Sequence, residues 1–366
     1  MSRNIKQIPF TEIVERTIEI SRLREDVTGK VRGIVNDVYV RDIPRVDDWM
    51  FFIARTSLTL SPEYNTGNAT VTTGGTTVTF SGATLDSSMT GRKIKFSNAD
   101  YIYDFTYSSP SDGTISPALV GSVNIAGGAF SIYQNIYDLP RNFDRFPKNG
   151  GLHMYQGGKP KNIPEKNYDY YIDQFNSTPN DNLEFCRVTG FDQDQRQVEV
   201  IPPPRTQGSV ECDYLKSVTP LKEYTAGTIT IGTGGTAVTG FSTDFTSVSV
   251  GDYIRAEGIG TKGDSEWYRI SSITDSSTLS IDTTWVTSSI VTGKFTISSA
   301  PQMPEAMHLA VLYGAVTAVS ADQNDPVAPA YKQKYADIMS DNKKIYRTRL
   351  IKQDVPTIAE EYHYRR

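Results

Sequence analysis

Two stretches of this chain, far apart in the sequence, match each other without a gap, and this repeat limits the possible folds more than any other feature. The turn Thr73-Gly-Gly-Thr76 matches Thr233-Gly-Gly-Thr236 at an offset of 160, and nine of the 24 positions from 73 to 96 are identical at that offset. Further along, Tyr103 matches Tyr268 at an offset of 165, so the second copy needs only a five-residue insertion. We therefore expect the same fold to occur twice.

Both copies have the pattern of short β-strands separated by glycine turns. In the first copy Val78 and Phe80 alternate with polar neighbours and follow the turn Gly74-Gly75, which is typical of a hairpin. Two copies with other sequence between them do not make a solenoid, because a solenoid needs adjacent repeats that stack. We expect two mutually similar small β-barrel or sandwich modules, namely module 1, residues 61–134, and module 2, residues 223–300.

The remainder of the chain, the host of the two modules, has helical and β parts. Residues 1–60 and 301–366 are predicted to be helical, whereas residues 135–222 are predicted to be a β segment rich in Tyr and Pro. Helical spacing in the N-terminal part is shown by Val31, Ile34, Val35 and Val38. The sequence thus predicts an α+β fold with a helical core, made of the N- and C-terminal helices and the β segment, into which both modules are inserted.

The composition argues against an enzyme. The 37 basic and 42 acidic residues give a net charge of -5, so no overall basic field attracts nucleic acid. With two cysteines and three isolated histidines, a zinc site or His-based catalysis is not expected. Phosphate-loop, nucleophile-elbow and zinc-protease motifs do not occur in the sequence. No apolar run is long enough to span a membrane. We expect no catalytic activity, no cofactor, no metal and no membrane contact.

The C-terminal part is predicted to hold a buried helix followed by a long basic helix. Residues 303–321 are apolar nearly all round, which is typical of a helix buried on every side. Between 327 and 352, seven basic side chains face only two acidic ones. A stripe at alternating steps of four and three, the spacing of a bundle face, is formed by Tyr331, Tyr335, Ile338, Asn342, Ile345 and Arg349. Three interpretations of this basic helix remain open: its charged face is exposed to solvent, contacts an acidic partner surface, or contacts nucleic acid.

Several stretches of the host, taken in order, resemble one protein family. They are Val31-Arg-Gly-Ile-Val-Asn-Asp-Val-Tyr39, Asp47-Asp-Trp-Met-Phe-Phe52, Ile136-Tyr-Asp-Leu-Pro140, Val198-Glu-Val-Ile-Pro-Pro203, Val210-Glu-Cys-Asp-Tyr214, Met303-Pro-Glu-Ala306 and Tyr331-Lys-Gln-Lys-Tyr335. Together they resemble the head-to-tail adaptor, or connector, proteins of tailed bacteriophages. The two β modules depart from the pattern of many adaptors, which affects the outer surface and its partners.

This resemblance implies a virion structural protein at the head-tail interface, assembled in the host cytoplasm. Adaptors of this family form a homo-oligomeric ring, commonly a dodecamer, beneath the portal protein. The ring extends the DNA channel through the neck, with DNA passing through the lumen without sequence specificity. The opposite end of the ring is a platform for tail or nozzle proteins.

The resemblance also implies that the C-terminal helices and the tail 351–366 contact the portal. The tail mixes apolar, aromatic and Arg side chains, and such residues dominate the energy of interfaces. The predicted portal-binding residues are Tyr331, Tyr335, Lys343, Lys344, Arg347, Arg349, Ile351, Val355, Ile358, Tyr362, Tyr364, Arg365 and Arg366.

A second function fits the β-rich composition. In this alternative the chain is a tail or baseplate recognition protein, and the duplicated modules bind a host surface or carbohydrate. An adaptor is expected to purify as a ring with the portal, whereas a recognition protein is expected to bind glycans or cells by itself.

Overall fold

The structure is a computed structural model of the chain. It describes residues 7–23, 27–99, 101–148, 150–156, 159–166, 179–192, 195–258, 265–323, 325–326 and 328–346.

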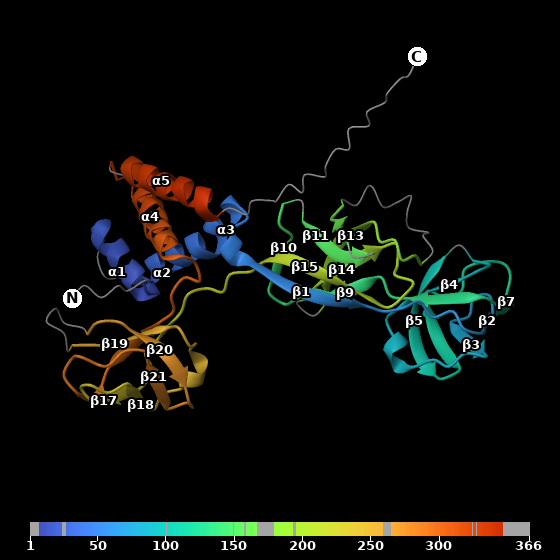
Figure 1. Ribbon diagram of the computed structural model, residues 1–366, viewed down its shortest axis with the longest axis horizontal. Helices are drawn as coiled ribbons and strands as arrows, with labels where there is room; N and C mark the ends of the chain where they lie inside the picture. Colours follow the sequence, from blue (N-terminus) through green and yellow to red (C-terminus); the bar gives the residue numbers. More distant parts are fainter. Residues whose placement is uncertain are drawn as a thin grey trace, which may run out of the picture. The chain divides into compact units, whose positions relative to one another are not determined.

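The chain forms two compact units (Figure 1). Unit 1 combines residues 1–52 with 218–366, and unit 2 is the continuous segment 53–217. The fold is mostly β, with 37% strand and 25% helix. The predicted α+β fold organised around a helical core is therefore wrong. Antiparallel sheets dominate, and the α-helices of the described chain all belong to unit 1.

One source of this error is the segment 53–60, which was predicted to be helical. It forms strand β1 (Ile53–Leu60), which pairs antiparallel with β15 (Gly208–Lys216) from Ile53 opposite Leu215 to Leu60 opposite Gly208. Leu58 and Leu60 are buried while Ser57 and Thr59 are exposed. This period of two is the signature of a half-buried strand rather than of a helix.

Module 1 lies in unit 2 and is a seven-stranded sheet. Its strands are β2 (Asn68–Val71), β3 (Thr77–Ser81), β4 (Lys93–Phe96), β5 (Ile102–Ser109), β6 (Asp112–Ser116), β7 (Ile125–Gly128) and β8 (Phe130–Tyr133). Their order across the sheet is β7-β2-β3-β6-β5-β4-β8. Inward-facing side chains form one apolar cluster that includes Phe80, Phe105 and Phe130.

Module 2 lies in unit 1 and has the same strand order. Its strands are β17 (Thr228–Ile231), β18 (Ala237–Phe241), β19 (Tyr253–Ala256), β20 (Tyr268–Ile273), β21 (Thr278–Ile281), β22 (Ile290–Gly293) and β23 (Phe295–Ser298). They run β22-β17-β18-β21-β20-β19-β23, and a short strand, β16 (Glu223–Tyr224), is added beside β23. The order matches module 1 strand for strand, so the internal repeat of the sequence is also a repeat of topology.

The two modules also share a close backbone approach at one glycine. Gly67 and Gly227, which are 160 positions apart, both have φ of +90°. A Cβ atom at either glycine would lie 2.5 Å from a carbonyl oxygen, that of Ser81 in module 1 and that of Phe241 in module 2. Only glycine combines this backbone conformation with so close an approach.

The rest of unit 2 consists of two small sheets. One has the order β1-β15-β11-β12 with β10 also on β15, and the other has the order β13-β14-β9. The additional strands are β9 (Ile136–Asp138), β10 (Phe143–Arg145), β11 (Gly151–Gln156), β12 (Lys159–Pro164), β13 (Phe185–Asp192) and β14 (Gln195–Ile201). Cys186 and Cys212 are both fully buried in the shared apolar cluster, and burial raises the pKa of each thiol to about 12. They therefore behave as small apolar side chains.

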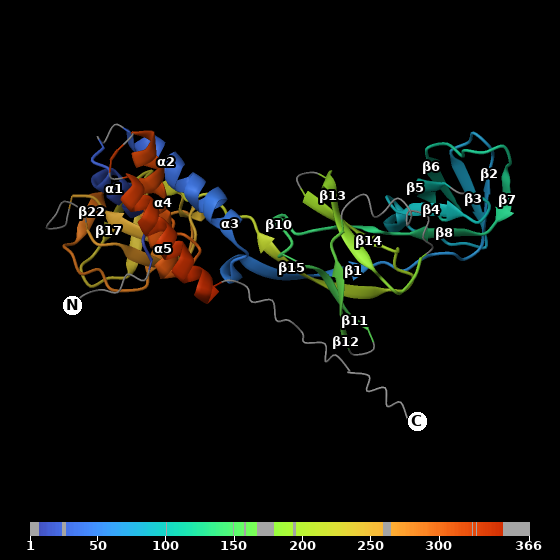
Figure 2. The same cartoon turned by 90° about the horizontal axis from the view of Figure 1, so that it is seen from above.

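The helices of unit 1 pack around α4 (Figure 2). They are α1 (Phe10–Ile20), α2 (Thr28–Asp37), the π-helix η2 (Val38–Asp42), α3 (Ile43–Val46), the 3-10 turn η3 (Met50–Phe52), α4 (Glu305–Asp322) and α5 (Ala328–Tyr346). Helix α4 contacts α1, α2 and α5 and is buried nearly all round, as its sequence predicts. At Gly314 an added Cβ would lie 2.7 Å from Val38 and 3.2 Å from Tyr335, so this glycine permits the close packing.

Candidate interaction site

The predicted stripe on α5 is used mainly inside unit 1. Tyr331, Tyr335 and Ile338 are half-buried and Asn342 is buried, and the Tyr335 ring packs beside Gly314 of α4. Burial, together with the nearby carboxylate of Asp42, raises the pKa of Tyr335 to about 12. These side chains therefore stabilise the α4–α5 pair.

The lysines predicted near the end of α5 have different surroundings. The Lys343 ammonium lies 3.8 Å from the Asp47 carboxylate, so this contact ties α5 to the segment after α3. Lys344 lies 3.0 Å from Asp341 on the same helix, and both side chains are well exposed. Exposed pairs of this kind contribute little to stability. Lys344 is therefore placed to meet a partner, whereas Lys343 is partly engaged within unit 1.

The other predicted portal-binding residues lie outside the described part of the chain. They are Arg347, Arg349, Ile351, Val355, Ile358, Tyr362, Tyr364, Arg365 and Arg366.

The C-terminal end of α5 is basic and carries one exposed large apolar side chain. Ile345 belongs to the predicted stripe but is 66% exposed. It lies next to Lys344 in the sequence, in the last turn of the helix. On the same helix, the Lys334 ammonium lies 4.2 Å from the centre of the Tyr313 ring of α4. We define the α5 end as Lys344 and Ile345.

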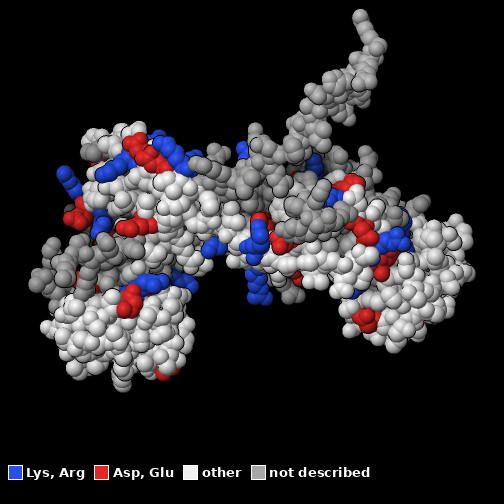
Figure 3. Space-filling model, viewed as in Figure 1, with Lys and Arg blue, Asp and Glu red and all other residues white. Residues whose placement is uncertain are grey.

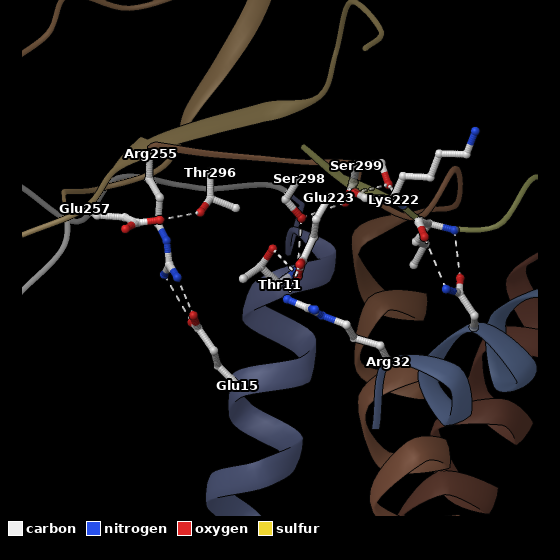
Figure 4. A network of polar contacts seen from close by, with 12 residues as sticks. Thr11, Glu15, Arg32, Lys222, Glu223, Arg255, Glu257, Thr296, Ser298 and Ser299 are labelled. Atoms are coloured by element: carbon white, nitrogen blue, oxygen red, sulfur yellow. Dashed lines mark hydrogen bonds and ion pairs between the residues drawn. The ribbon is translucent and has the colours of Figure 1, made fainter. Parts of the chain in front are cut away.

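A second polar cluster joins α1 and α2 to module 2 (Figure 4). The Glu223 carboxylate of β16 accepts a hydrogen bond of 2.8 Å from the Thr11 hydroxyl and forms an ion pair with Arg32 of α2. The Glu223 side chain is only 11% exposed. Ion pairs shielded in this way interact more strongly than those on an open surface, because less water screens them.

Thr11 lies in the first turn of helix α1 and does not cap it. The helix begins at Phe10, after Pro9, and has no side-chain cap. The Thr11 backbone N–H donates instead to the Ser298 hydroxyl at 3.0 Å, while its own hydroxyl donates to Glu223. The first turn of α1 thus obtains its hydrogen-bond partners from module 2.

One turn further along α1, the Glu15 carboxylate accepts two hydrogen bonds from the Arg255 guanidinium of β19. The Arg255 side chain is 13% exposed, and its guanidinium lies 4.6 Å from the centre of the Trp267 ring. A bidentate contact combined with stacking on an aromatic ring is the geometry for which Arg is better suited than Lys.

A cleft of about 520 Å³ lies beside this cluster, at the linkers that connect the helices to module 2. Tyr39, Lys222, Asp252 and Arg269 contribute to its lining. The Tyr39 hydroxyl accepts the Gln302 N–H at 2.9 Å, and burial raises the pKa of Asp252. With both signs of charge on its walls and several groups engaged by the linkers, the cleft does not indicate one class of ligand.

His308 secures the segment before α1 to α4. Its Nδ1 accepts the Ile8 N–H at 2.9 Å, and its Nε2 lies 3.1 Å from the Met303 carbonyl oxygen, to which it donates. Burial lowers the pKa of His308, so the neutral ring is favoured. This buried histidine has a structural role, as its position on an apolar helix predicts.

The described residues show neither a metal-binding cluster nor a membrane-spanning helix. There, no three His, Cys, Asp or Glu side chains gather closely enough to hold a metal ion. Among the helices that the structure describes, none combines the length and the hydropathy needed to cross a bilayer.

Charge is unevenly distributed on the face shown in Figure 3. Basic and acidic side chains are interspersed over the helices and at their junction with module 2, whereas most of the visible surface of both modules is uncharged. Comparison of the chain with protein-family models and with curated proteins finds no match.

The Glu15–Arg255 and Thr11–Glu223 contacts were not predicted from the sequence, although the repeat contains a signal for them. Arg255 is aligned with Lys95, and Glu223 is aligned with Glu63, both at the offset of 160. The two modules are otherwise rich in Thr and Ser, so charges of the same sign at equivalent positions are the signal that could have marked this face.

Proposed function

We propose that this chain is a head-to-tail adaptor, a virion structural protein that forms a ring beneath a portal and extends the DNA channel. In this role it assembles in the host cytoplasm, becomes part of the neck, and offers its other end to tail or nozzle proteins. The proposal is based on the order of the host segments that resemble the adaptor family. It does not depend on a helical core.

One observation in unit 1 supports a partner surface next to the predicted tail. Beyond the part of α5 that packs on α4, the α5 end presents Lys344 and Ile345 to solvent. An exposed Ile beside an ammonium group suits a protein surface that offers an apolar pocket with an acidic rim, because apolar contacts at the centre and charges at the edge are typical of interfaces. Residues 351–366, which follow, hold the predicted aromatic and Arg anchors.

Co-sedimentation of the full chain with the purified portal protein of the same virus tests this proposal. We expect ring-shaped particles on the portal in electron micrographs. Deleting 351–366 is expected to abolish capture. The double variant Lys344→Glu/Ile345→Asp is expected to weaken capture by about tenfold or more, which corresponds to about 1.4 kcal/mol. Lys294→Glu, at an exposed position of module 2, is the matched control and is expected to have no effect. Absence of any wild-type complex would contradict the proposal.

The recognition alternative is favoured by the β content and by the surface of module 2. Phe241 and Val291 are 74% and 79% exposed on that module, and a large exposed ring is the kind of side chain on which a sugar can stack. If the chain is a recognition protein, it binds host cells or immobilised glycans without portal, and Phe241→Ser weakens that binding. Portal capture without glycan binding supports the adaptor, and the reverse result supports the alternative.

A further inference from the structure

We propose that strand β1 is a docking edge through which two copies of this chain pair with each other, strand beside strand, so that one sheet continues from the first copy into the second. This inference goes beyond the adaptor role and does not depend on it. It is based on the backbone of β1, because one edge of this strand is not paired with any strand of the described chain.

Strand β1 stands at one end of the order β1-β15-β11-β12, so β15 pairs with only one of its two edges (Figure 1). All eight residues of Ile53–Leu60 are in register with β15. In an antiparallel pair, alternate residues point their N–H and C=O groups toward the partner strand, and the others point them away. Arg55 aside, the groups that point away form no backbone hydrogen bond within the described chain. They are the template that an incoming strand needs.

Two other edge strands of unit 2, β12 and β13, are protected. Strand β13 also has eight residues, but its register with β14 shifts within the strand, and Glu165 forms a bridge with Cys186 on the opposite edge. Strand β12 contains Pro160 and Pro164, which have no N–H group to donate. Irregular register, added bridges and prolines keep the edge of a sheet from pairing with another chain. Within the described chain β1 has none of these, so its edge is open.

The side chains of β1 show what an incoming strand must offer on each face. On the inner face Leu58 and Leu60 are buried in the apolar cluster of unit 2, and Ala54 packs against that cluster. On the outer face Ser57 and Thr59 are exposed. The incoming strand is therefore expected to carry small or apolar side chains on the inner face and small polar side chains on the outer face.

A second copy of β1 meets both requirements. In an antiparallel pair, residues directly opposite each other lie on the same face of the sheet, so two identical strands keep their inner faces together only if one residue lies opposite itself. With Ser57 at this central position, Leu60 lies opposite Ala54 on the inner face. Because each copy uses the same surface, the contact closes as a dimer.

The charges of β1 and β15 are compatible with this pairing. Arg55 is the one charged residue of β1, and pairing centred on Ser57 places it opposite Thr59 rather than opposite another Arg. On its own sheet its guanidinium donates hydrogen bonds of 2.6 and 2.9 Å to the Asp213 carboxylate. Its charge is therefore balanced within each copy, and no like charges oppose each other across the new strand pair.

Sedimentation velocity of the full-length chain tests this proposal. The contact is limited to one strand edge, and small interfaces are weak. We therefore expect a monomer–dimer equilibrium in which the dimer fraction rises over chain concentrations from about 1 to about 500 μM. The mass of the larger species distinguishes a dimer from a ring.

Lysine on the outer face of β1 is expected to weaken the dimer. Ser57→Lys places two ammonium groups opposite each other, or each opposite Arg55 if the pairing is centred on Thr56 instead, and is expected to raise the dimer Kd by about fivefold. Ser209→Lys is the matched control. Ser209 is exposed on β15 and its hydroxyl lies 2.6 Å from that of Ser57, so both variants lose the same contact. Because β1 lies between Ser209 and the open edge, we expect this control to leave the dimer unchanged.

Two further variants test whether β1 itself forms the dimer. An equimolar mixture of Ser57→Lys and Ser57→Glu chains is expected to recover dimerisation, because opposite charges then face each other. Ser57→Cys is expected to give disulfide-linked dimers on mild oxidation, whereas Ser209→Cys is not. Cys186 and Cys212 are buried and do not compete.

Two results would overturn the proposal. The first is a wild-type chain that stays monomeric up to about 500 μM. The second is a dimer or larger assembly that is as tight in Ser57→Lys as in the wild type, or that Ser209→Lys weakens equally, since the contact would then lie on another surface. Thermal unfolding checks that each variant is folded. If Ser57→Lys unfolds, Ser57→Cys decides, and absence of its interchain disulfide overturns the proposal.

Discussion

Modules 1 and 2 have the same strand order but place their central aromatic side chain at different positions. In module 1 the Phe80 ring packs 4.8 Å from that of Phe130. In module 2 the residue equivalent to Phe130 is Phe295, and the ring that packs on it, at 6.0 Å, is that of Phe245. Phe245 is aligned with Leu85 and not with Phe80. The same backbone thus accepts an aromatic ring from either side of a turn.

The two positions compensate each other in volume. Phe80 is aligned with Gly240, where an added Cβ would lie 2.8 Å from the Phe245 ring. Phe80 with Leu85 in one module is therefore replaced by Gly240 with Phe245 in the other. Cores tolerate such exchanges when the total volume and the apolar pattern are kept.

A second compensating pair lies on the neighbouring strands. The residue opposite Val78 is Gly113 in module 1, and the residue opposite the equivalent Val238 is Leu279 in module 2. An added Cβ at Gly113 would lie 2.2 Å from the Phe105 ring, which fills the space. The residue aligned with Phe105 is Ile270, a smaller side chain. Phe105 and Gly113 in module 1 thus fill the space that Ile270 and Leu279 fill in module 2.

The largest predicted effect tests this exchange. Gly113→Leu is expected to destabilise module 1 by about 4 kcal/mol, because the new side chain must displace the Phe105 ring in a closed core. Adding Phe105→Ile to this variant is expected to restore stability to within about 1.5 kcal/mol of the wild type. Hydrogen exchange measured by mass spectrometry on peptides from 61–134 reports the effect. If the double variant is as unstable as the single one, the two modules do not share this packing.

The next prediction concerns the aromatic ring of module 2. Phe245→Ala is expected to cost about 4 kcal/mol and Leu85→Ala in module 1 about 3 kcal/mol, because each leaves a cavity in proportion to the volume removed. Trp267 and Trp285 lie in module 2 and no Trp lies in module 1, so tryptophan fluorescence follows unfolding of the first variant. Equal losses of stability from Phe245→Ala and Leu85→Ala would show that the Phe245 ring contributes no more to module 2 than Leu85 contributes to module 1.

A smaller difference in stability is expected between substitution of Arg255 in module 2 and of Lys95, its equivalent in module 1. Arg255→Ala is expected to cost about 1.5 kcal/mol, because it removes the stacking on Trp267 and the hydrogen bonds to the partly exposed Glu15. Lys95→Ala at the equivalent position of module 1 is expected to cost about 0.5 kcal/mol or less. Urea denaturation of the full chain, followed by hydrogen exchange in each module, compares the two. A loss in Lys95→Ala as large as that in Arg255→Ala would contradict the difference expected between the two modules.

The smallest predicted effect comes from the backbone. Gly127 has φ of +64°, and the residue at the equivalent position of module 2, Thr292, has φ of +56°. Both donate their N–H to an equivalent threonine hydroxyl, Thr70 at 3.2 Å and Thr230 at 3.3 Å. Threonine is strained in this region, whereas glycine is not.

Exchanging these residues is therefore expected to have opposite effects. Thr292→Gly is expected to stabilise module 2 by about 0.5 kcal/mol, since the relief of strain exceeds the extra chain entropy of glycine. Gly127→Thr is expected to destabilise module 1 by about 1 kcal/mol. No Cβ contact lies within 4 Å at Gly127, so steric overlap does not confuse the comparison. Thermal unfolding measures both, and destabilisation by Thr292→Gly would contradict the strain argument.

The strand pairs and turns of the modules could be predicted because they are written into local sequence. The glycines at 67, 74 and 91 recur at 227, 234 and 251, and all six have positive φ. The alternation of apolar and polar residues, as at Val78 and Phe80, indicates which side chains face inward. Repetition of the pattern, at an offset of 160 and then of 165, links these local signals to one topology, since similar sequences meet the same physical constraints twice.

The helical core, by contrast, could not be judged from local pattern. Short apolar runs near residues 50–60 are compatible with a helix or a strand. The segment is a strand because β1 pairs with β15, which is about 150 residues away in the chain. The stripe on α5 showed that the helix has a packing face but not which surface covers it. The structure assigns that face to α4 through Gly314 and Tyr335 and leaves Lys344 and Ile345, at the end of the helix, exposed.

The sequence by itself determined that two β modules recur, where their glycine turns fall, and that one C-terminal helix is buried. Only the tertiary structure decided how these parts are joined, because the decisive contacts connect residues distant in sequence. Arg255 and Glu15 are 240 positions apart, and neither has a local pattern that names the other. The periodicity of apolar residues in the sequence indicates that a side chain is buried. Which residue it contacts depends on burial and charge complementarity across the whole fold.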